Sequence, residues 1–79
     1  MTNDAIARRL REHAAELARG GDNLYRVRAF RQAALAVLTL PEPVETTLTA
    51  RGRGGLEQVP GIGRSLAETI AGYTGERGA

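Results

Sequence analysis

The sequence predicts an all-α protein, a compact bundle of four to five short helices. Apolar residues recur along most of the chain at spacings of three and four, which places them on one face of an α-helix. Hydrophobic residues make up 42% of the 79 residues and aromatic residues only 4%. The core is therefore mainly aliphatic side chains and alanine, which suit packed helices better than a sheet. No stretch is a candidate strand, and a chain of this length forms one domain, residues 1–79.

The first helix is expected from about Asn3 to Arg19. Thr2 or Asn3 can cap its first turn through a side-chain oxygen, and Gly20 with Gly21 ends it. Its apolar stripe consists of Ile6, Leu10, Ala14 and Leu17.

The second helix is expected between a cap at Asp22 or Asn23 and the helix-breaking residues Pro41 and Pro43. Its apolar face consists of Phe30, Ala33, Ala34, Val37 and Leu38. Three arginines lie outside this face or near its edge: Arg26, Arg28 and Arg31. The alanines on the face would allow a neighbouring helix to come close.

The second half of the chain predicts shorter elements. Pro43 can begin a third helix that runs from Val44 to about Ala50. Residues 51–55, RGRGG, form a glycine-rich joint, and residues 56–59 form a single helical turn. The last helix ends near Thr74, and its apolar residues are Leu66, Ala67, Ile70 and Ala71.

Composition excludes several kinds of chemistry. All 11 basic residues are arginines, against nine acidic residues, so the net charge is +2 and no lysine amine can form a Schiff base. The chain has no cysteine for disulfides or thiolate metal sites. His13 has no second ligand residue near it and is expected on a helix surface. With no apolar signal region or membrane-spanning run, we expect a cytoplasmic protein, associated with the nucleoid if it is bacterial.

The stretch LEQVPGIGRSLAETI, from Leu56 to Ile70, resembles a helix-hairpin-helix motif that occupies about residues 55–74. Gly61 and Gly63 are expected to adopt backbone angles closed to other residues and to leave room for a ligand. The amides of the hairpin and of the following helical turn then point outward and form an anion site. Ile62 anchors the hairpin in the core, and the Arg64 guanidinium can bind a phosphate. A simple turn between two helices could also contain the sequence PGIG of residues 60–63, but apolar residues at the positions expected for the motif favour a helix-hairpin-helix.

Upstream, the stretch NLYRVRAFRQAALAVLTLP resembles the N-terminal domain of family X DNA polymerases, the group that contains DNA polymerase beta. These domains carry a basic helix with an aromatic residue, then a proline, then the hairpin motif. The resemblance extends from about Ile6 to Gly75 and includes none of the catalytic domains of a polymerase. Because Met1 is followed by an ordinary helix start, we expect a complete small protein rather than a fragment.

The resemblance implies a domain that grips the DNA backbone near a gap or a 5′ phosphate. Together with the arginines of the preceding helix, the phosphate-binding residues expected are Gly61, Gly63, Arg64, Ser65, Arg26, Arg28 and Arg31. The resemblance also implies that the main-chain carbonyls of Glu57, Val59 and Ile62 can hold a monovalent cation, K⁺ or Na⁺, although no cofactor is required. Phe30 takes the place of a tyrosine in the 5′-phosphate pocket. Thr69 takes the place of the Schiff-base lysine of lyase-type members, so we expect no enzymatic activity.

The expected function is a non-enzymatic DNA-binding module that recognises gapped, nicked or 5′-phosphate ends by their backbone, in DNA repair or replication. Its partners would be DNA and a repair or replication enzyme, and the protein would be a monomer or a weak dimer. The alternative is a protein–protein docking module that has kept the fold without binding DNA, which a net charge of only +2 allows.

Overall fold

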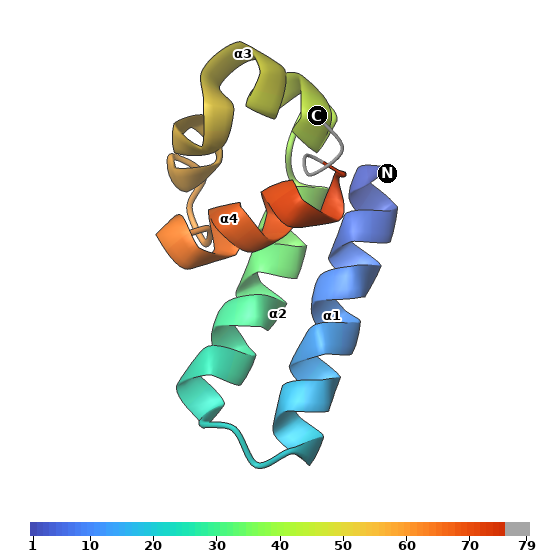
Figure 1. Cartoon of the computed structure of the whole chain (residues 1–79), viewed down its shortest axis with the longest axis vertical. Coiled ribbons are helices and arrows are strands. Elements are labelled where there is room, and N and C mark those ends of the chain that lie inside the picture. The colour runs from blue at the N-terminus through green and yellow to red at the C-terminus, as the bar shows by residue number, and fades with distance from the viewer. Residues whose placement is uncertain (76–79) are drawn as a thin grey trace.

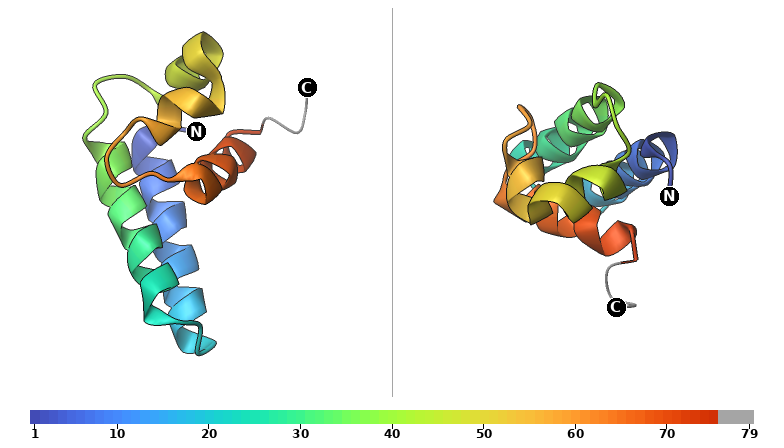
Figure 2. Two further views of the ribbon diagram at one scale, coloured as in Figure 1. Left: turned by 90° about the vertical axis from the view of Figure 1, so that its left-hand side faces the viewer. Right: turned by 90° about the horizontal axis from the view of Figure 1, so that it is seen from above.

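The structure, a computed structural model, describes residues 1–75 and contains four helices in that part of the chain (Figure 1). They are α1 (Asn3–Arg19), α2 (Leu24–Leu38), α3 (Val44–Glu57) and α4 (Arg64–Tyr73). No strand occurs among these residues, so the predicted all-α fold is confirmed. α1 and α2 lie side by side in opposite directions, α3 lies at the end of this pair where α1 begins, and α4 crosses both helices (Figures 1 and 2). None of the four helices is long and apolar enough to cross a membrane.

Local sequence signals define the two long helices, as predicted. Thr2 Oγ1 accepts the amide three residues later at 3.1 Å, and Asn23 Oδ1 does the same for α2 at 2.8 Å. α1 ends at Arg19 with Gly20 as its C-cap, and Gly21 has a positive φ of 80° that turns the chain toward α2. The two capping bonds made by Thr2 and Asn23 satisfy amides that would otherwise be unpaired at the starts of α1 and α2.

The core lies mainly between α1, α2 and α4. Its buried residues from the first two helices are Ile6, Ala7, Leu10, Ala14, Val27, Phe30, Ala33, Ala34, Ala36 and Val37. The predicted place of Leu38 on the buried face is wrong, because Leu38 is 45% exposed, whereas Val27 is 1% exposed. Each step of four residues rotates about 40° around a helix, so a row that starts at Phe30 has left the buried face when it reaches Leu38.

α3 is longer than predicted. The sequence predicts a helix that ends near Ala50, a joint over residues 51–55 and a separate turn at residues 56–59. Instead, the helix continues to Glu57 and is interrupted only at Gly52, whose φ of 69° and ψ of −166° are not helical. The joint is therefore a kink at one residue, because glycine alone readily adopts this positive φ.

The two parts of α3 approach each other closely at Gly55, which is buried. A Cβ at this position would lie 2.7 Å from Arg51 Cβ and 3.2 Å from a methyl carbon of Thr47. Gly55 therefore has a packing role, whereas the sequence pattern indicated only a glycine-rich joint.

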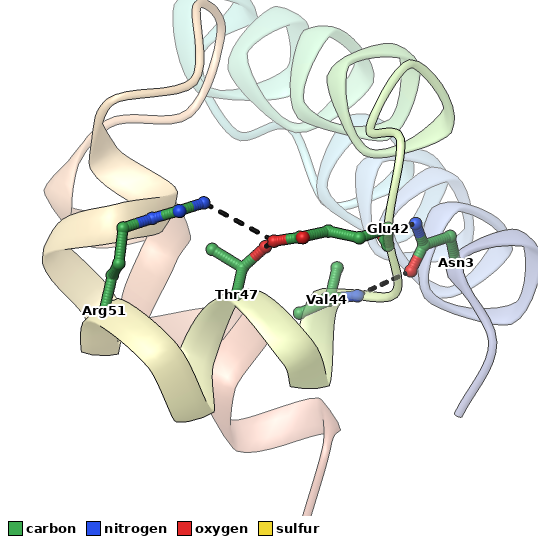
Figure 3. A network of polar contacts seen from close by, with 5 residues as sticks. All are labelled: Asn3, Glu42, Val44, Thr47 and Arg51. Carbon is green, nitrogen blue, oxygen red and sulfur yellow. Dashed lines mark hydrogen bonds and ion pairs between the residues drawn. The ribbon is translucent and has the colours of Figure 1, made fainter.

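A polar network connects the start of α1 to the beginning of α3 (Figure 3). Asn3 donates through Nδ2 to Glu42 O at 2.9 Å and accepts the amide of Val44 through Oδ1 at 2.9 Å. The Glu42 carboxylate accepts the Thr47 hydroxyl at 2.5 Å and lies 3.4 Å from Arg51 Nη2. These contacts orient α3 and thereby the chain that leads into α4.

Candidate nucleic-acid interface

The hairpin between α3 and α4 is anchored by one buried side chain. Ile62 is 3% exposed and belongs to the core, as predicted. Its amide donates to Val59 O at 3.0 Å, and the Val59 amide donates to Leu56 O at 3.0 Å. After the hairpin, the amide of Ala67 donates to Gly63 O at 2.9 Å and closes the first turn of α4. The hairpin is thus a defined structure with one apolar attachment to the core.

Around this anchor, a set of main-chain amides has no partner. Within residues 1–75, the amides of Gly61, Gly63, Arg64 and Ser65 form no hydrogen bond. All four residues are exposed. Three of these amides lie at the cap and in the first turn of α4, where the helix dipole is positive. Such a group of free donors attracts anions, and phosphate is a common ligand of helix N-termini.

The two hairpin glycines serve different purposes. Gly61 has a positive φ of 96°, and a Cβ there would lie 3.3 Å from Ala36 Cβ and 3.5 Å from Gln32 O of α2. Gly63 has a φ of −91° and a ψ of −174°, an extended conformation that any residue adopts, and a Cβ there would meet nothing within 4 Å. The prediction that both glycines need angles closed to other residues is therefore wrong for Gly63. The open space at Gly63 leaves its surroundings accessible to a ligand.

We expect Gly61→Ala to lower the free energy of unfolding by about 1–2 kcal/mol, because alanine is strained at positive φ. Its methyl group would also press on Ala36. Gly63→Ala should change stability by less than about 0.5 kcal/mol, because the weaker N-cap is offset by a less flexible unfolded chain. Urea denaturation followed by circular dichroism measures both values. Equal losses for the two variants would contradict the different roles of the glycines.

A shallow groove runs along the hairpin, and α2 forms part of its wall. The groove is lined by residues 57–66 together with Ala29 and Gln32 of α2. The exposed residue Glu57 also lines the groove, and its carboxylate repels an anion that binds there. Attraction must therefore come from the free amides and from nearby arginines.

The arginines of α2 are exposed but do not share one side of the helix. Arg28 lies one turn before Gln32 and therefore on the side of the groove. Arg26 is only two residues from Arg28, so it lies on another side, where its guanidinium is 6.0 Å from the centre of the Phe30 ring. Arg31 directly precedes Gln32, about 100° around the helix. Of the three α2 arginines, helix geometry therefore places only Arg28 toward the groove, which Arg64 at the start of α4 also lines.

A second cluster, which the sequence did not predict, joins α1, α2 and α4. His13 is half-buried rather than isolated on the surface. Its Nδ1 lies 3.2 Å from the Tyr73 hydroxyl, and its ring centre lies 4.5 Å from that of Phe30. The Arg9 guanidinium lies 5.0 Å from the centre of the Tyr73 ring. No local pattern could reveal this pair, because its members are 60 positions apart in the sequence.

Burial raises the pKa of the Tyr73 phenol above its ordinary value of 10.0; the positive charge of Arg9 opposes this shift and the negative charge of Glu16 adds to it. The folded protein therefore holds the phenolic proton to higher pH than the unfolded chain does. Above the unfolded value, the unfolded chain binds fewer protons, so stability falls as the pH rises toward the folded value.

Tyr73→Phe should remove this alkaline loss of stability. Near neutral pH the same variant should cost about 1 kcal/mol, because the hydrogen bond to His13 is lost. Urea denaturation at about pH 8 and about pH 11 measures both effects. Tyr25→Phe is the matched control, because it removes the same hydroxyl from a side chain that is 87% exposed. An unchanged alkaline loss in Tyr73→Phe would show that another group causes it.

The main-chain carbonyls expected to hold a cation lie in one short segment. Glu57 ends α3, and Val59 and Ile62 follow in the hairpin. Val59 O already accepts the Ile62 amide at 3.0 Å, which leaves its second lone pair for a cation. Residues 1–75 contain no group of three His, Asp or Glu side chains that could bind a metal. These carbonyls are hard oxygen donors of the kind that suits K⁺ or Na⁺.

The fold and the hairpin define a helix-hairpin-helix protein, and comparison with known families agrees. The family model described as a helix-hairpin-helix domain matches residues 1–74. The chain therefore belongs to the helix-hairpin-helix domain family, whose members generally bind DNA without sequence specificity. No curated protein and no solved structure matches the chain at a significant level.

Proposed function

We propose that this protein is a non-enzymatic module that binds DNA through the sugar-phosphate backbone. The observation that carries the proposal is a set of free, exposed amides: that of Gly61 in the hairpin and those of Gly63 and Arg64 at the positive end of α4. Donors of this kind fit phosphate oxygens. Contacts to phosphates carry no base information, so binding is independent of sequence.

The preferred DNA would carry a gap, a nick or a 5′-phosphate end. The resemblance to the N-terminal domain of family X DNA polymerases supports this preference and a role in DNA repair or replication. Ser65 and Arg64 contact one phosphate group, and Arg28 contacts the backbone on the α2 side of the groove. Tyr25 is 87% exposed, so its ring is open to stack on an unpaired base at a gap.

Binding through one hairpin and few arginines is expected to be weak. The dissociation constant should be on the order of 10⁻⁴–10⁻⁶ M at physiological salt and should rise strongly with salt. A monovalent cation held by the carbonyls of Glu57, Val59 and Ile62 would add positive charge near the phosphate. A partner enzyme that supplies a second contact with the DNA would raise the affinity further.

Titration of the isotope-labelled protein with gapped duplex DNA tests the proposal by NMR. The amides of residues 61–66 and of Arg28 should shift, and added salt should reverse the shifts. Duplexes with and without a 5′ phosphate at the gap show whether the end is recognised. Absence of shifts in the hairpin would contradict the proposal.

The absence of enzymatic activity is part of the proposal. The chain has no lysine, and the hydroxyl of Thr69 donates to Ser65 O at 3.1 Å. A hydroxyl cannot form the imine that lyase chemistry requires. Incubation with an incised abasic substrate and borohydride should yield no covalent adduct. Efficient trapping would contradict this expectation and would direct attention to the amine of Met1.

A further inference from the structure

α2 carries a row of exposed leucines on the side away from the core. Leu24 is 68% exposed, Leu35 65% and Leu38 45%. With two exposed arginines between them they form a stripe with alternating spacings of four and three residues, which we call the outer stripe: Leu24, Arg28, Arg31, Leu35 and Leu38. This spacing is that of the seam along which one helix packs on another in a coiled coil.

No element of residues 1–75 covers the outer stripe. The core contacts of α2 are made by residues such as Val27, Phe30 and Val37, and the hairpin side is formed by Ala29 and Gln32. The outer stripe occupies the remaining side of the helix, with Arg28 at its border with the groove. Single exposed leucines are common on protein surfaces, but three at seam positions of one helix form an apolar row that a partner can cover.

We propose that the outer stripe binds an acidic amphipathic helix of a partner protein. α2 contains no aspartate or glutamate, so Arg28 and Arg31 make the middle of the stripe positive without a neutralising residue on the same helix. A complementary helix carries carboxylates at the centre of its own seam and apolar residues at both ends. The leucines provide buried apolar area, and the two arginine–carboxylate pairs select the partner and its register.

Charge also argues against a second copy of this chain as the occupant. In an antiparallel pair of α2 helices the Arg31 residues of the two copies face each other near the centre, and in a parallel pair Arg28 and Arg31 each face their own copy. Both arrangements place like charges along a short seam, which is unfavourable. DNA is not the occupant either, because leucine side chains offer nothing to phosphates.

The expected affinity is low, because a contact along one helix of 15 residues is smaller than a standard protein–protein interface. A dissociation constant on the order of 10⁻⁵ M is consistent with a transient contact. The site is separate from the free amides of the hairpin. Arg28 lies between the two surfaces, whereas Arg31 and the leucines belong to the outer stripe alone.

A synthetic helical peptide tests the proposal. The peptide carries leucines at both ends of a heptad seam and two glutamates at its centre, and it is added to the full-length isotope-labelled protein. NMR should show shifts at the outer stripe and none at residues 61–66. A peptide with lysines in place of the two glutamates should bind at least about tenfold more weakly. Leu35→Ser should weaken binding of the glutamate peptide similarly and leave the titration with gapped DNA unchanged.

Three outcomes would overturn the proposal. The first is absence of shifts with the glutamate peptide, and the second is equal binding of the glutamate and lysine peptides. The third is a concentration-dependent dimer in sedimentation experiments that disappears in Leu35→Ser, which would make a second copy the occupant. Failure of DNA binding would leave the peptide result intact, because residues 61–66 report only on DNA, whereas Arg31 and the leucines of the outer stripe report only on the peptide.

Discussion

Gly63→Asp is expected to reduce DNA binding at least about tenfold while the fold stays as stable as before or becomes more stable. Gly63 is the N-cap of α4, and a Cβ there would meet nothing within 4 Å. Aspartate is a favourable N-cap, and its carboxylate would accept amides of the first helical turn. The same carboxylate would occupy the place of a phosphate and repel the DNA backbone. A loss of binding without a loss of stability separates the ligand site from the scaffold.

Gly63→Asn is the matched control, because asparagine has the same shape and is an equally good N-cap without the negative charge. DNA binding is measured by fluorescence anisotropy with a gapped duplex at low salt, and stability is measured by thermal unfolding. Repulsion by the added charge predicts that Gly63→Asn binds several times more tightly than Gly63→Asp. If both variants bind DNA as the original protein does, the phosphate does not bind at the start of α4.

Leu56→Ala should destabilise the protein by roughly 3 kcal/mol, a large part of the total stability of a domain of this size. Leu56 is fully buried at the end of α3, directly before the hairpin. Removing its side chain leaves a cavity beneath the segment that positions the free amides. Loss of DNA binding should therefore accompany the loss of fold.

Leu35→Ala makes the same chemical change at a position that is 65% exposed, and it should cost less than about 0.5 kcal/mol. Chemical denaturation of both variants gives the comparison. A small effect of Leu56→Ala would mean that the second part of α3 is not part of the cooperative fold.

Much of the candidate site could be predicted because its signals are local. The prolines and glycines mark where helices end, and Ile62 stands at the one apolar position between the hairpin glycines. A helix N-terminus exposes its first amides wherever it occurs, so the free donors at Gly63 and Arg64 follow from the start of α4 alone. The arrangement of the arginines of α2 could not be read in the same way, because it depends on which side of α2 the hairpin contacts.

The sequence by itself determined the all-α class, the boundaries of α1, α2 and α4 and the buried anchor of the hairpin, because each depends on residues a few positions apart. Only the tertiary structure decided which glycines are indispensable and which leucines remain uncovered. Gly61 and Gly55 are required where another part of the chain comes close, whereas Gly63 borders open space. The contact of His13 with Tyr73 and the exposure of Leu38 likewise depend on how the helices pack. Such contacts join residues distant in the sequence, and no local pattern encodes them.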